Sequence, residues 1–181
     1  MIALNDQINA ARDVTKTHTS SVETFKSGDV GLLGVVDQDR VIFARAAPLR
    51  RQHIPLKTDS APPVEIVAMY GGADGRLVKA AVDQGVKGIV VQALGWCNMN
   101  QPMFAAVKDA IANGVPVVIA SRVPTGRVLP NYGFEGGGKT LADAGAVMAD
   151  DLSPQKARIL LMLLLQSGIR DQKGLQAAFS K

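Results

Sequence analysis

The pattern of apolar and polar positions divides the chain into a short front part, a polar stretch and a longer regular part. In the front part, residues 2–4 are apolar, and residues 34–43 hold two β-rich runs around a polar turn, which predicts a hairpin. Residues 1–48 are therefore predicted to be strand-rich. Residues 49–63 are polar, lack periodicity and carry several prolines, so they are predicted to form a linker.

From Val64 onward, short apolar runs alternate with helically spaced ones. The runs predict strands at 64–69, 88–91, 115–120 and 146–149. The helical spacing predicts helices at 77–84, 102–113, 140–144, 154–166 and 175–179. Strands that alternate with helices form βαβ units with a parallel sheet. The fold class is therefore α/β, with a small Rossmann-like parallel sheet after the strand-rich front part.

In open parallel sheets, ligands bind beyond the carboxyl ends of the strands. Three predicted loops lie there, at residues 70–75, 93–101 and 121–139. The second and third are rich in Gly, Asn and Pro, so a site in this half is expected among them.

Composition narrows the class of protein. Hydrophobic residues make up 47% and charged residues 20%, which is typical of a globular protein. The longest apolar run, residues 159–165, is too short to span a bilayer, so no membrane partner is expected. Residues 1–6 lack the features of a secretory signal, so the chain as written is expected in the cytoplasm. Cys97 is the single cysteine, which excludes an intrachain disulfide.

The charge pattern gives no reason to expect a nucleic-acid partner. The formal net charge is +4, but the positive charges are dispersed and aromatic residues make up only 4%. A nucleic-acid surface needs a basic stripe or stacking side chains between basic residues.

Residues 133–140 satisfy the phosphate-loop pattern G-x-x-x-x-G-K-T. Its sequence context argues against nucleotide binding. Pro130 interrupts the strand that should precede the loop, Gly145 shortens the helix that should follow, and Glu135 adds negative charge beside the phosphates. We interpret the segment as a flexible glycine loop, and a phosphate-binding domain has no other support in the sequence.

Residues 12–17, Arg-Asp-Val-Thr-Lys-Thr, have the composition of a catalytic loop. Lys16 lies between two threonines and beside an Arg-Asp pair, although the residues alone favour an ordinary surface lysine. Four segments together resemble the bacterial L-asparaginase family, specifically the type II asparaginases and glutaminase-asparaginases: 11–19, 25–27, 121–126 and 153–158. The resemblance covers nearly the whole chain but only the later part of the family's sequence.

The resemblance implies hydrolysis of the side-chain amide of L-asparagine, and more slowly that of L-glutamine, to the acid and ammonia. The nucleophile in the family is a threonine, assisted by a second threonine, an aspartate and a lysine. Lys16 matches that lysine. A lysine in a dry pocket near polar groups can assist proton transfer. The resemblance also implies a homo-oligomer, with no cofactor and no metal, and its type II members are often periplasmic.

Two further residues match positions that the family's neighbouring subunit contributes to the substrate site. Asn98 matches an asparagine that helps to hold the substrate, and its amide can donate and accept at once. Trp96 and Cys97 depart from the glycines that the family has around it. Glu135 is a candidate for an acidic residue from the long loop, with a solvated loop glutamate as the open alternative.

The family's Thr-Gly-Gly-Thr and Gly-Thr-Asp motifs, which carry its threonines and aspartate, do not occur in this sequence. We therefore expect residues 1–48 to be the C-terminal remnant of the asparaginase N-terminal domain, residues 49–63 a linker, and residues 64–181 the C-terminal domain. A lysine without its nucleophile cannot transfer an acyl group, so the chain alone is expected to be inactive. The alternative is a non-catalytic amino-acid-binding or subunit-interaction module.

Overall fold

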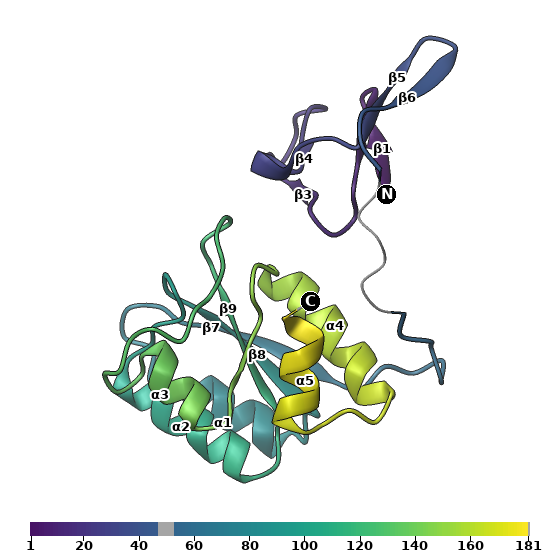
Figure 1. Ribbon diagram of the computed structural model, residues 1–181. Coiled ribbons are helices and arrows are strands. Elements are labelled where there is room, and N and C mark those ends of the chain that lie inside the picture. The colour runs from purple at the N-terminus through teal and green to yellow at the C-terminus, as the bar shows by residue number, and fades with distance from the viewer. Residues whose placement is uncertain (47–52, 181) are drawn as a thin grey trace. The chain divides into compact units, whose positions relative to one another are not determined.

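The computed structural model describes residues 1–46 and 53–180 (Figure 1). The first residues of the predicted linker, 49–52, lie outside this range. The chain separates into two compact units, Met1–Arg51 and Gln52–Lys181, each described here by itself.

Unit 1 contains a four-stranded antiparallel sheet in the order β1-β2-β5-β6. Its strands are β1 (Ile2–Leu4), β2 (Gln7–Asn9), β5 (Gly34–Asp37) and β6 (Arg40–Phe43). A separate strand pair is formed by β3 (Thr15–Lys16) and β4 (Phe25–Lys26), followed by the 3₁₀ helix η1 (Gly28–Val30). The predicted strand-rich front part and the hairpin at 34–43 are confirmed. The prediction of a loop over 12–17 is wrong at its end, because Thr15 and Lys16 pair with β4.

The core of unit 1 is small. Ile8, Ala10 and Leu33 are buried together, with Val36 packed against them. Beside this core, the Ser27 hydroxyl donates a 2.6 Å hydrogen bond to Oδ1 of Asn9, which has no exposed surface. The bond joins the end of β2 to the residue that follows β4, so it supports the strand pair that carries Lys16.

Unit 2 has the predicted α/β architecture. Its parallel sheet has the order β10-β9-β8-β7, made of β7 (Val64–Ala68), β8 (Gly88–Ala93), β9 (Val117–Ser121) and β10 (Val147–Met148). The helices are α1 (Arg76–Asp83), α2 (Gln101–Ala112), α3 (Gly138–Asp143), α4 (Pro154–Gln166) and α5 (Gln172–Phe179). Helices α1 and α2 pack together on one side of the sheet, and α4 packs across β7, β8 and β9 on the other (Figure 1).

Local capping signals explain where several helices begin. Ser153 caps α4 and accepts a hydrogen bond from the amide of Lys156, with Pro154 as the first helical residue, as predicted. The last helix begins three residues earlier than predicted because Asp171 caps it, with Oδ1 accepting from the amide of Gly174 at 2.8 Å. A short polar side chain before the helix was the missed signal.

The third strand begins two residues later than predicted. The amide of Val115 donates to the carbonyl of Ala110 at 3.0 Å and so closes α2. Pro116 has no amide hydrogen to donate to a neighbouring strand. The parallel ladder with β8 therefore starts at Val117, which pairs with Ile89.

The segment before β7 is held along α4 by side chains. Nε2 of Gln166 donates to the carbonyl and the hydroxyl of Thr58, at 2.7 and 2.8 Å. Nζ of Lys57 donates to the carbonyl of Ser167 at 3.2 Å. Within the described ranges, no helix is both long and apolar enough to cross a membrane.

Candidate functional site

Two loops meet beyond the carboxyl ends of β8 and β9. The first, residues 94–100, is a tight turn in which Leu94 and Asn98 exchange backbone hydrogen bonds of 3.0 and 2.8 Å. The turn leaves Trp96 exposed and buries Cys97.

Cys97 is a structural residue of this turn. It has no exposed surface, and its thiol donates to the carbonyl of Leu129 in the second loop at 3.3 Å. Burial raises the pKa of the Cys97 thiol to about 11. The thiolate is the nucleophilic form of cysteine, so Cys97 is poorly suited to act as a nucleophile at neutral pH.

The second loop, residues 122–137, lies against the first through its backbone. The amide of Met99 donates to the carbonyl of Gly136 at 2.9 Å, and the amide of Leu129 donates to the carbonyl of Trp96 at 3.3 Å. Gly136 has a φ of +89°, and a Cβ added there would lie 2.3 Å from the carbonyl oxygen of Met99. Both the conformation and the close approach require glycine at this position.

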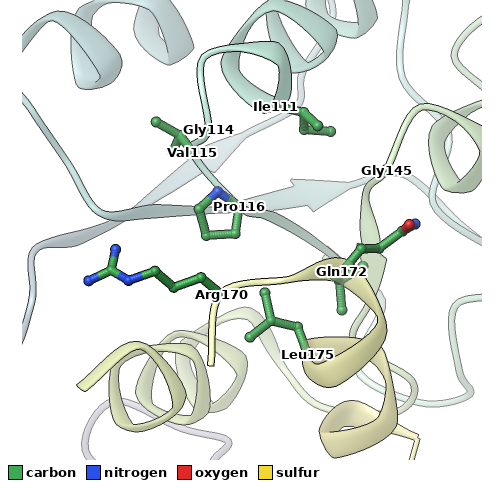
Figure 2. Close-up of a pocket in the computed structure, with 9 residues that line it drawn as sticks. Ile111, Gly114, Val115, Pro116, Gly145, Arg170, Gln172 and Leu175 are labelled. Carbon is green, nitrogen blue, oxygen red and sulfur yellow. The ribbon is translucent and has the colours of Figure 1, made fainter. Parts of the chain in front are cut away.

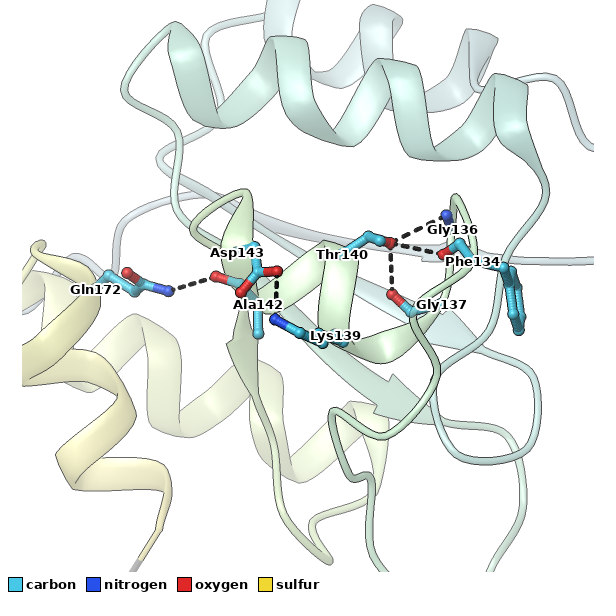
Figure 3. A network of polar contacts seen from close by, with 8 residues as sticks. All are labelled: Phe134, Gly136, Gly137, Lys139, Thr140, Ala142, Asp143 and Gln172. Atoms are coloured by element: carbon cyan, nitrogen blue, oxygen red, sulfur yellow. Dashed lines mark hydrogen bonds and ion pairs between the residues drawn. The ribbon is translucent and has the colours of Figure 1, made fainter.

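The glycine run that mimics a phosphate loop is packed rather than flexible, which corrects the sequence interpretation. A Cβ at Gly138 would lie 2.4 Å from the sulfur of Cys97. The Thr140 hydroxyl lies within hydrogen-bonding distance of the carbonyls of Phe134 and Gly137, at 3.0 and 2.9 Å, and accepts from the amide of Gly136 at 3.2 Å (Figure 3).

The lysine of that pattern is also engaged. Nζ of Lys139 lies 2.8 Å from Oδ2 of Asp143, one turn along α3 (Figure 3). This helix has six residues, and no strand directly precedes the loop. The hydroxyl of Thr140 is thus bonded to the backbone of the loop and Lys139 is paired with Asp143 of α3, which supports the sequence argument against nucleotide binding.

The structure brings Asn98 and Glu135 to the same pair of loops. Asn98 directly precedes Met99, and Glu135 directly precedes Gly136. Because the amide of Met99 donates to the carbonyl of Gly136, the backbones of Asn98 and Glu135 are neighbours. Oδ1 of Asn98 is buried and has no hydrogen-bond partner among the described residues. Glu135 is exposed, and its Oε2 accepts from Nε2 of Gln101 at 2.9 Å. A buried amide oxygen without a partner is uncommon in folded proteins.

Lys16 belongs to unit 1, on strand β3. Its side chain is exposed, with Nζ 6.0 Å from the centroid of the Phe25 ring. In the same strand pair, the hydroxyl of Thr17 donates to the carbonyl of Thr24 at 2.9 Å. The dry pocket that a catalytic lysine needs is therefore not formed around Lys16 by the described residues of unit 1.

A turn anchored by His18 follows the strand of Lys16. Nδ1 of His18 accepts from the amides of Ser20 and Ser21 at 3.1 and 3.0 Å. The carbonyl of His18 accepts from the Thr24 hydroxyl, whose oxygen in turn accepts from the His18 amide at 2.8 Å. Two backbone donors on one ring nitrogen require that nitrogen to be unprotonated.

Comparison with known proteins identifies the family. Residues 63–179 match the family described as the Glutaminase/Asparaginase C-terminal domain, and residues 1–49 match the one described as Asparaginase, N-terminal. This chain belongs to the asparaginase family. Lys16 lies within the N-terminal asparaginase match, and Asn98 and Glu135 lie within the C-terminal one.

Curated asparaginases are similar over nearly the whole chain. The L-asparaginase of Bacillus licheniformis is 33% identical over 175 residues, which cover 95% of this chain and 54% of that protein. L-asparaginase 2 of Escherichia coli is 35% identical over 186 residues, covering 100% and 51%. The probable L-asparaginase of Deinococcus radiodurans is 36% identical over 173 residues, covering 93% and 51%. The chain spans about half the length of the curated relatives it matches.

A row of three aromatic side chains within the C-terminal asparaginase match was not predicted from the sequence. The rings of Trp96, Tyr132 and Phe134 follow one another at centroid distances of 5.7 Å. All three are exposed and lie in the two loops that carry Asn98 and Glu135. They are three of the chain's eight aromatic residues. Their concentration within two otherwise polar loops is the sequence feature that could have predicted an exposed aromatic row.

The loop of residues 70–75, which follows the carboxyl end of β7, is joined to the start of α1 by a surface ion pair between Asp74 and Arg76. Nε of Arg76 donates to Oδ1 and Oδ2 of Asp74 at 3.0 and 2.8 Å. Hydrogen bonding from the Arg76 side chain lowers the pKa of Asp74. Nδ2 of Asn100 donates to the carbonyl of Ala73 at 2.6 Å, which fixes this loop to the start of α2.

A small cavity of about 160 Å³ lies elsewhere, where β9 begins (Figure 2). Pro116 and Leu175 line it, and Arg170 lies at its side. The amide of Gln172 points away, because its Nε2 donates to the carbonyls of Ala142 and Ala146 at 3.1 and 3.3 Å. The cavity is thus mainly apolar and distinct from the loops that carry the candidate residues.

Proposed function

We propose that this chain is the C-terminal portion of an L-asparaginase and supplies the lysine of its catalytic triad. The observation that carries the proposal is the pair of family matches, which follow one another along the chain and include Lys16 in the first. The names of the curated relatives support L-asparagine as the substrate, with L-aspartate and ammonia as products. L-glutamine is the second substrate to test.

The division of the chain into two domain portions and a linker is also part of the proposal. Residues 1–48 are the end of the N-terminal domain, residues 49–63 a linker, and residues 64–181 the C-terminal domain. The bounds of the two family matches support it, because they leave residues 50–62 outside both.

In the proposed reaction, a threonine hydroxyl attacks the side-chain amide carbon, and the amide nitrogen leaves as ammonia after taking up a proton. Water then cleaves the acyl-enzyme and restores the threonine. Lys16 assists the proton transfers through the second threonine of the triad. Neither threonine motif occurs in these 181 residues, so the proposed nucleophile is not among them. We therefore propose that this chain by itself is inactive.

Asn98 and Glu135 are proposed to hold the substrate of a neighbouring subunit. The amide of Asn98 can donate to a carboxylate and accept from an ammonium group, which suits an α-amino acid. Its unpartnered Oδ1 and the exposed carboxylate of Glu135 support this role. Residues that act on a neighbouring site require an oligomer, so a homo-oligomeric enzyme is part of the proposal.

Ammonia release tests the proposal. The purified chain should release no more ammonia from L-asparagine than its Lys16→Ala variant. Activity should appear when the chain is mixed with the portion of E. coli L-asparaginase 2 that carries the threonine motifs. Lys16→Ala should abolish the restored activity, whereas Lys26→Ala, an exposed lysine on the paired strand β4, should retain it. Equal activities for these two variants would rule out the role of Lys16.

A non-catalytic module is the second candidate. Asn98, Glu135 and the aromatic row lie together in unit 2 without Lys16, which favours ligand or subunit binding by that unit alone. Binding of the E. coli portion without any restored ammonia release would support this candidate over the enzyme.

A further inference from the structure

The cavity of about 160 Å³ in unit 2 lies at the amino ends of β9 and β10, between the end of α2 and the start of α5 (Figure 2). Its floor is buried, since Val147 is 1% exposed and Leu175 has no exposed surface. Gly114, Arg170 and Gln172 also line the cavity and are exposed. The cavity is therefore a buried apolar space that solvent reaches past a partly polar rim.

The walls of this cavity are held in place by the fold. The amide of Val115 donates to the carbonyl of Ala110 and closes α2, and the amide of Ala146 donates to the carbonyl of Leu141 after α3, both at 3.0 Å. The side chain of Asp171 caps the start of α5. The space is thus formed without a ligand, as small-molecule sites usually are.

Arg170 is the one charged side chain among the described residues that line the cavity. Within the described ranges, its guanidinium makes no hydrogen bond or ion pair with the rest of the chain. The neighbouring Asp171 turns its carboxylate toward its own helix, where Oδ1 accepts from the amide of Gly174 at 2.8 Å. Nε2 of Gln172 donates to two backbone carbonyls at 3.1 and 3.3 Å and points away from the cavity. Arg170 is therefore the polar group left to meet a ligand, and a guanidinium pairs best with a carboxylate or a phosphate.

We propose that this cavity binds a small organic acid, in which a carboxylate is attached to an aromatic ring or a branched apolar group. The apolar part lies between Pro116 and Leu175, and the carboxylate pairs with Arg170 at the side of the cavity (Figure 2). The volume sets the size of the apolar part at about six carbons, because an apolar cavity of about 150 Å³ accommodates a benzene molecule.

L-asparagine and L-aspartate fit this cavity poorly. Both carry an α-ammonium group and a polar side chain, and none of the described residues that line the cavity is acidic. Polar groups that enter an apolar space without partners lose their hydration without compensation. The site is therefore separate from the proposed asparaginase reaction and does not depend on it.

The first arm of the test titrates the isotope-labelled chain with sodium benzoate and follows the backbone amides by NMR. Saturable binding is expected, with a Kd of about 1 mM or lower for a ligand this small. The amides of Gly114, Gly145 and Gln172 should shift, and those of residues 94–100 and 122–137 should not. Absence of saturation would overturn the proposal, as would shifts confined to the two loops.

Two further probes separate the parts of the ligand. Benzyl alcohol keeps the ring and lacks the carboxylate, whereas acetate keeps the carboxylate and lacks the ring. Each should bind at least about tenfold more weakly than benzoate, because the proposed site uses both parts. Acetate that binds as tightly as benzoate would reduce the site to a surface anion contact and overturn the proposal.

Arg170→Gln tests the charged partner. Arg170 is exposed, so thermal unfolding of this variant should match the unsubstituted chain. Benzoate should bind the variant at least about tenfold more weakly, and binding of benzyl alcohol should be unchanged. Lys173→Gln is the matched control, because Lys173 is an exposed cation on the same turn that does not line the cavity. It should weaken benzoate binding by less than about twofold, since exposed charges are screened by water and salt. Equal losses for the two variants would mean general attraction of anions and would overturn the proposal.

Ile111→Phe tests the apolar part, since Ile111 is a partly buried residue of the α2 wall. The larger ring should occupy part of the space and weaken both benzoate and benzyl alcohol by at least about tenfold. Circular dichroism establishes that the variant is folded, and the Arg170→Gln result decides the proposal if it is not. Unchanged benzoate binding by folded Ile111→Phe would place the ligand outside the cavity and overturn the proposal.

Discussion

The amide of Met99 donates a 2.9 Å hydrogen bond to the carbonyl of Gly136, and this contact joins the loops that carry Asn98 and Glu135. Asn98 and Glu135 are 37 residues apart in the sequence, but each directly precedes one of the two residues joined by this hydrogen bond. Their backbones are therefore neighbours in space. The geometry of the candidate site therefore depends on a close approach between two loop backbones.

Gly136→Ala should disrupt this approach. The new Cβ would lie 2.3 Å from the carbonyl oxygen of Met99, and alanine would be strained at a φ of +89°. We expect unfolding to become easier by about 2–4 kcal/mol, as for other substitutions that combine backbone strain with a clash. Denaturant unfolding followed by circular dichroism measures the change.

Gly133→Ala is the matched control for this loop. Gly133 has no positive φ, and an added Cβ would meet no atom within 4 Å. Its effect on the free energy of unfolding should be within about 0.5 kcal/mol, as for most surface substitutions. Similar losses for the two variants would contradict the argument that close packing requires Gly136.

Cys97 should make stability depend on pH in the alkaline range. The pKa of its thiol is raised from 9.0 to about 11 by burial, so the folded state holds the proton more tightly than the unfolded state. This stabilisation is fully present below pH 9 and is lost as pH rises toward 11. We expect a loss of roughly 1–2 kcal/mol across that window, beyond the loss from other groups.

Cys97→Ser isolates this effect, because a serine hydroxyl can still donate to Leu129 but does not ionise in this range. Denaturant unfolding of both proteins at several pH values gives the difference. The advantage of the unsubstituted protein over Cys97→Ser should shrink from pH 8.5 to pH 11. A difference that does not change with pH would mean that the thiol is not held neutral by the fold.

Features set by local sequence could be predicted. The start of α4 follows from Ser153 as cap and Pro154 as first residue, and both signals lie beside the helix that they begin. The strand at Thr15–Lys16 was missed, because two residues carry no periodic pattern and the pairing with Phe25–Lys26 depends on the turn between them. Its backbone conformation depends on partners farther along the chain, since Thr15 pairs with Lys26, 11 residues away, and Lys16 with Phe25, 9 residues away.

The candidate site was only partly predictable for the same reason. Residue types and family motifs single out Lys16, Asn98 and Glu135 as candidates, and their roles stay predictions. The tight contact at Gly136 could not be read from the sequence, because a glycine run is equally typical of a flexible loop or a phosphate site. The row of Trp96, Tyr132 and Phe134 also depends on which loops lie side by side.

The turn after Lys16 should depend on His18. His18→Ala removes the acceptor for the amides of Ser20 and Ser21. Their hydrogen exchange should become at least several-fold faster, and the free energy of unfolding should fall by about 1 kcal/mol. His18→Asn should preserve most of the protection, because Oδ1 of asparagine occupies a position equivalent to Nδ1 and commonly accepts such bonds. Equal exchange rates in the Ala and Asn variants would show that the side-chain acceptor does not hold the turn.

Thr140 gives a test that separates a structural loop from a phosphate site. A phosphate loop needs the hydroxyl of this residue for Mg²⁺, whereas here it is bonded to backbone groups of Phe134, Gly136 and Gly137. Thr140→Val should therefore destabilise unit 2 by about 1–3 kcal/mol, and Thr140→Ser should be close to neutral. Calorimetry with Mg²⁺ and ATP should show no binding by either variant or by the unsubstituted chain. Micromolar ATP binding that Thr140→Val abolishes would mean that the loop opens to bind phosphate, because its hydroxyl cannot serve the loop backbone and the metal at once.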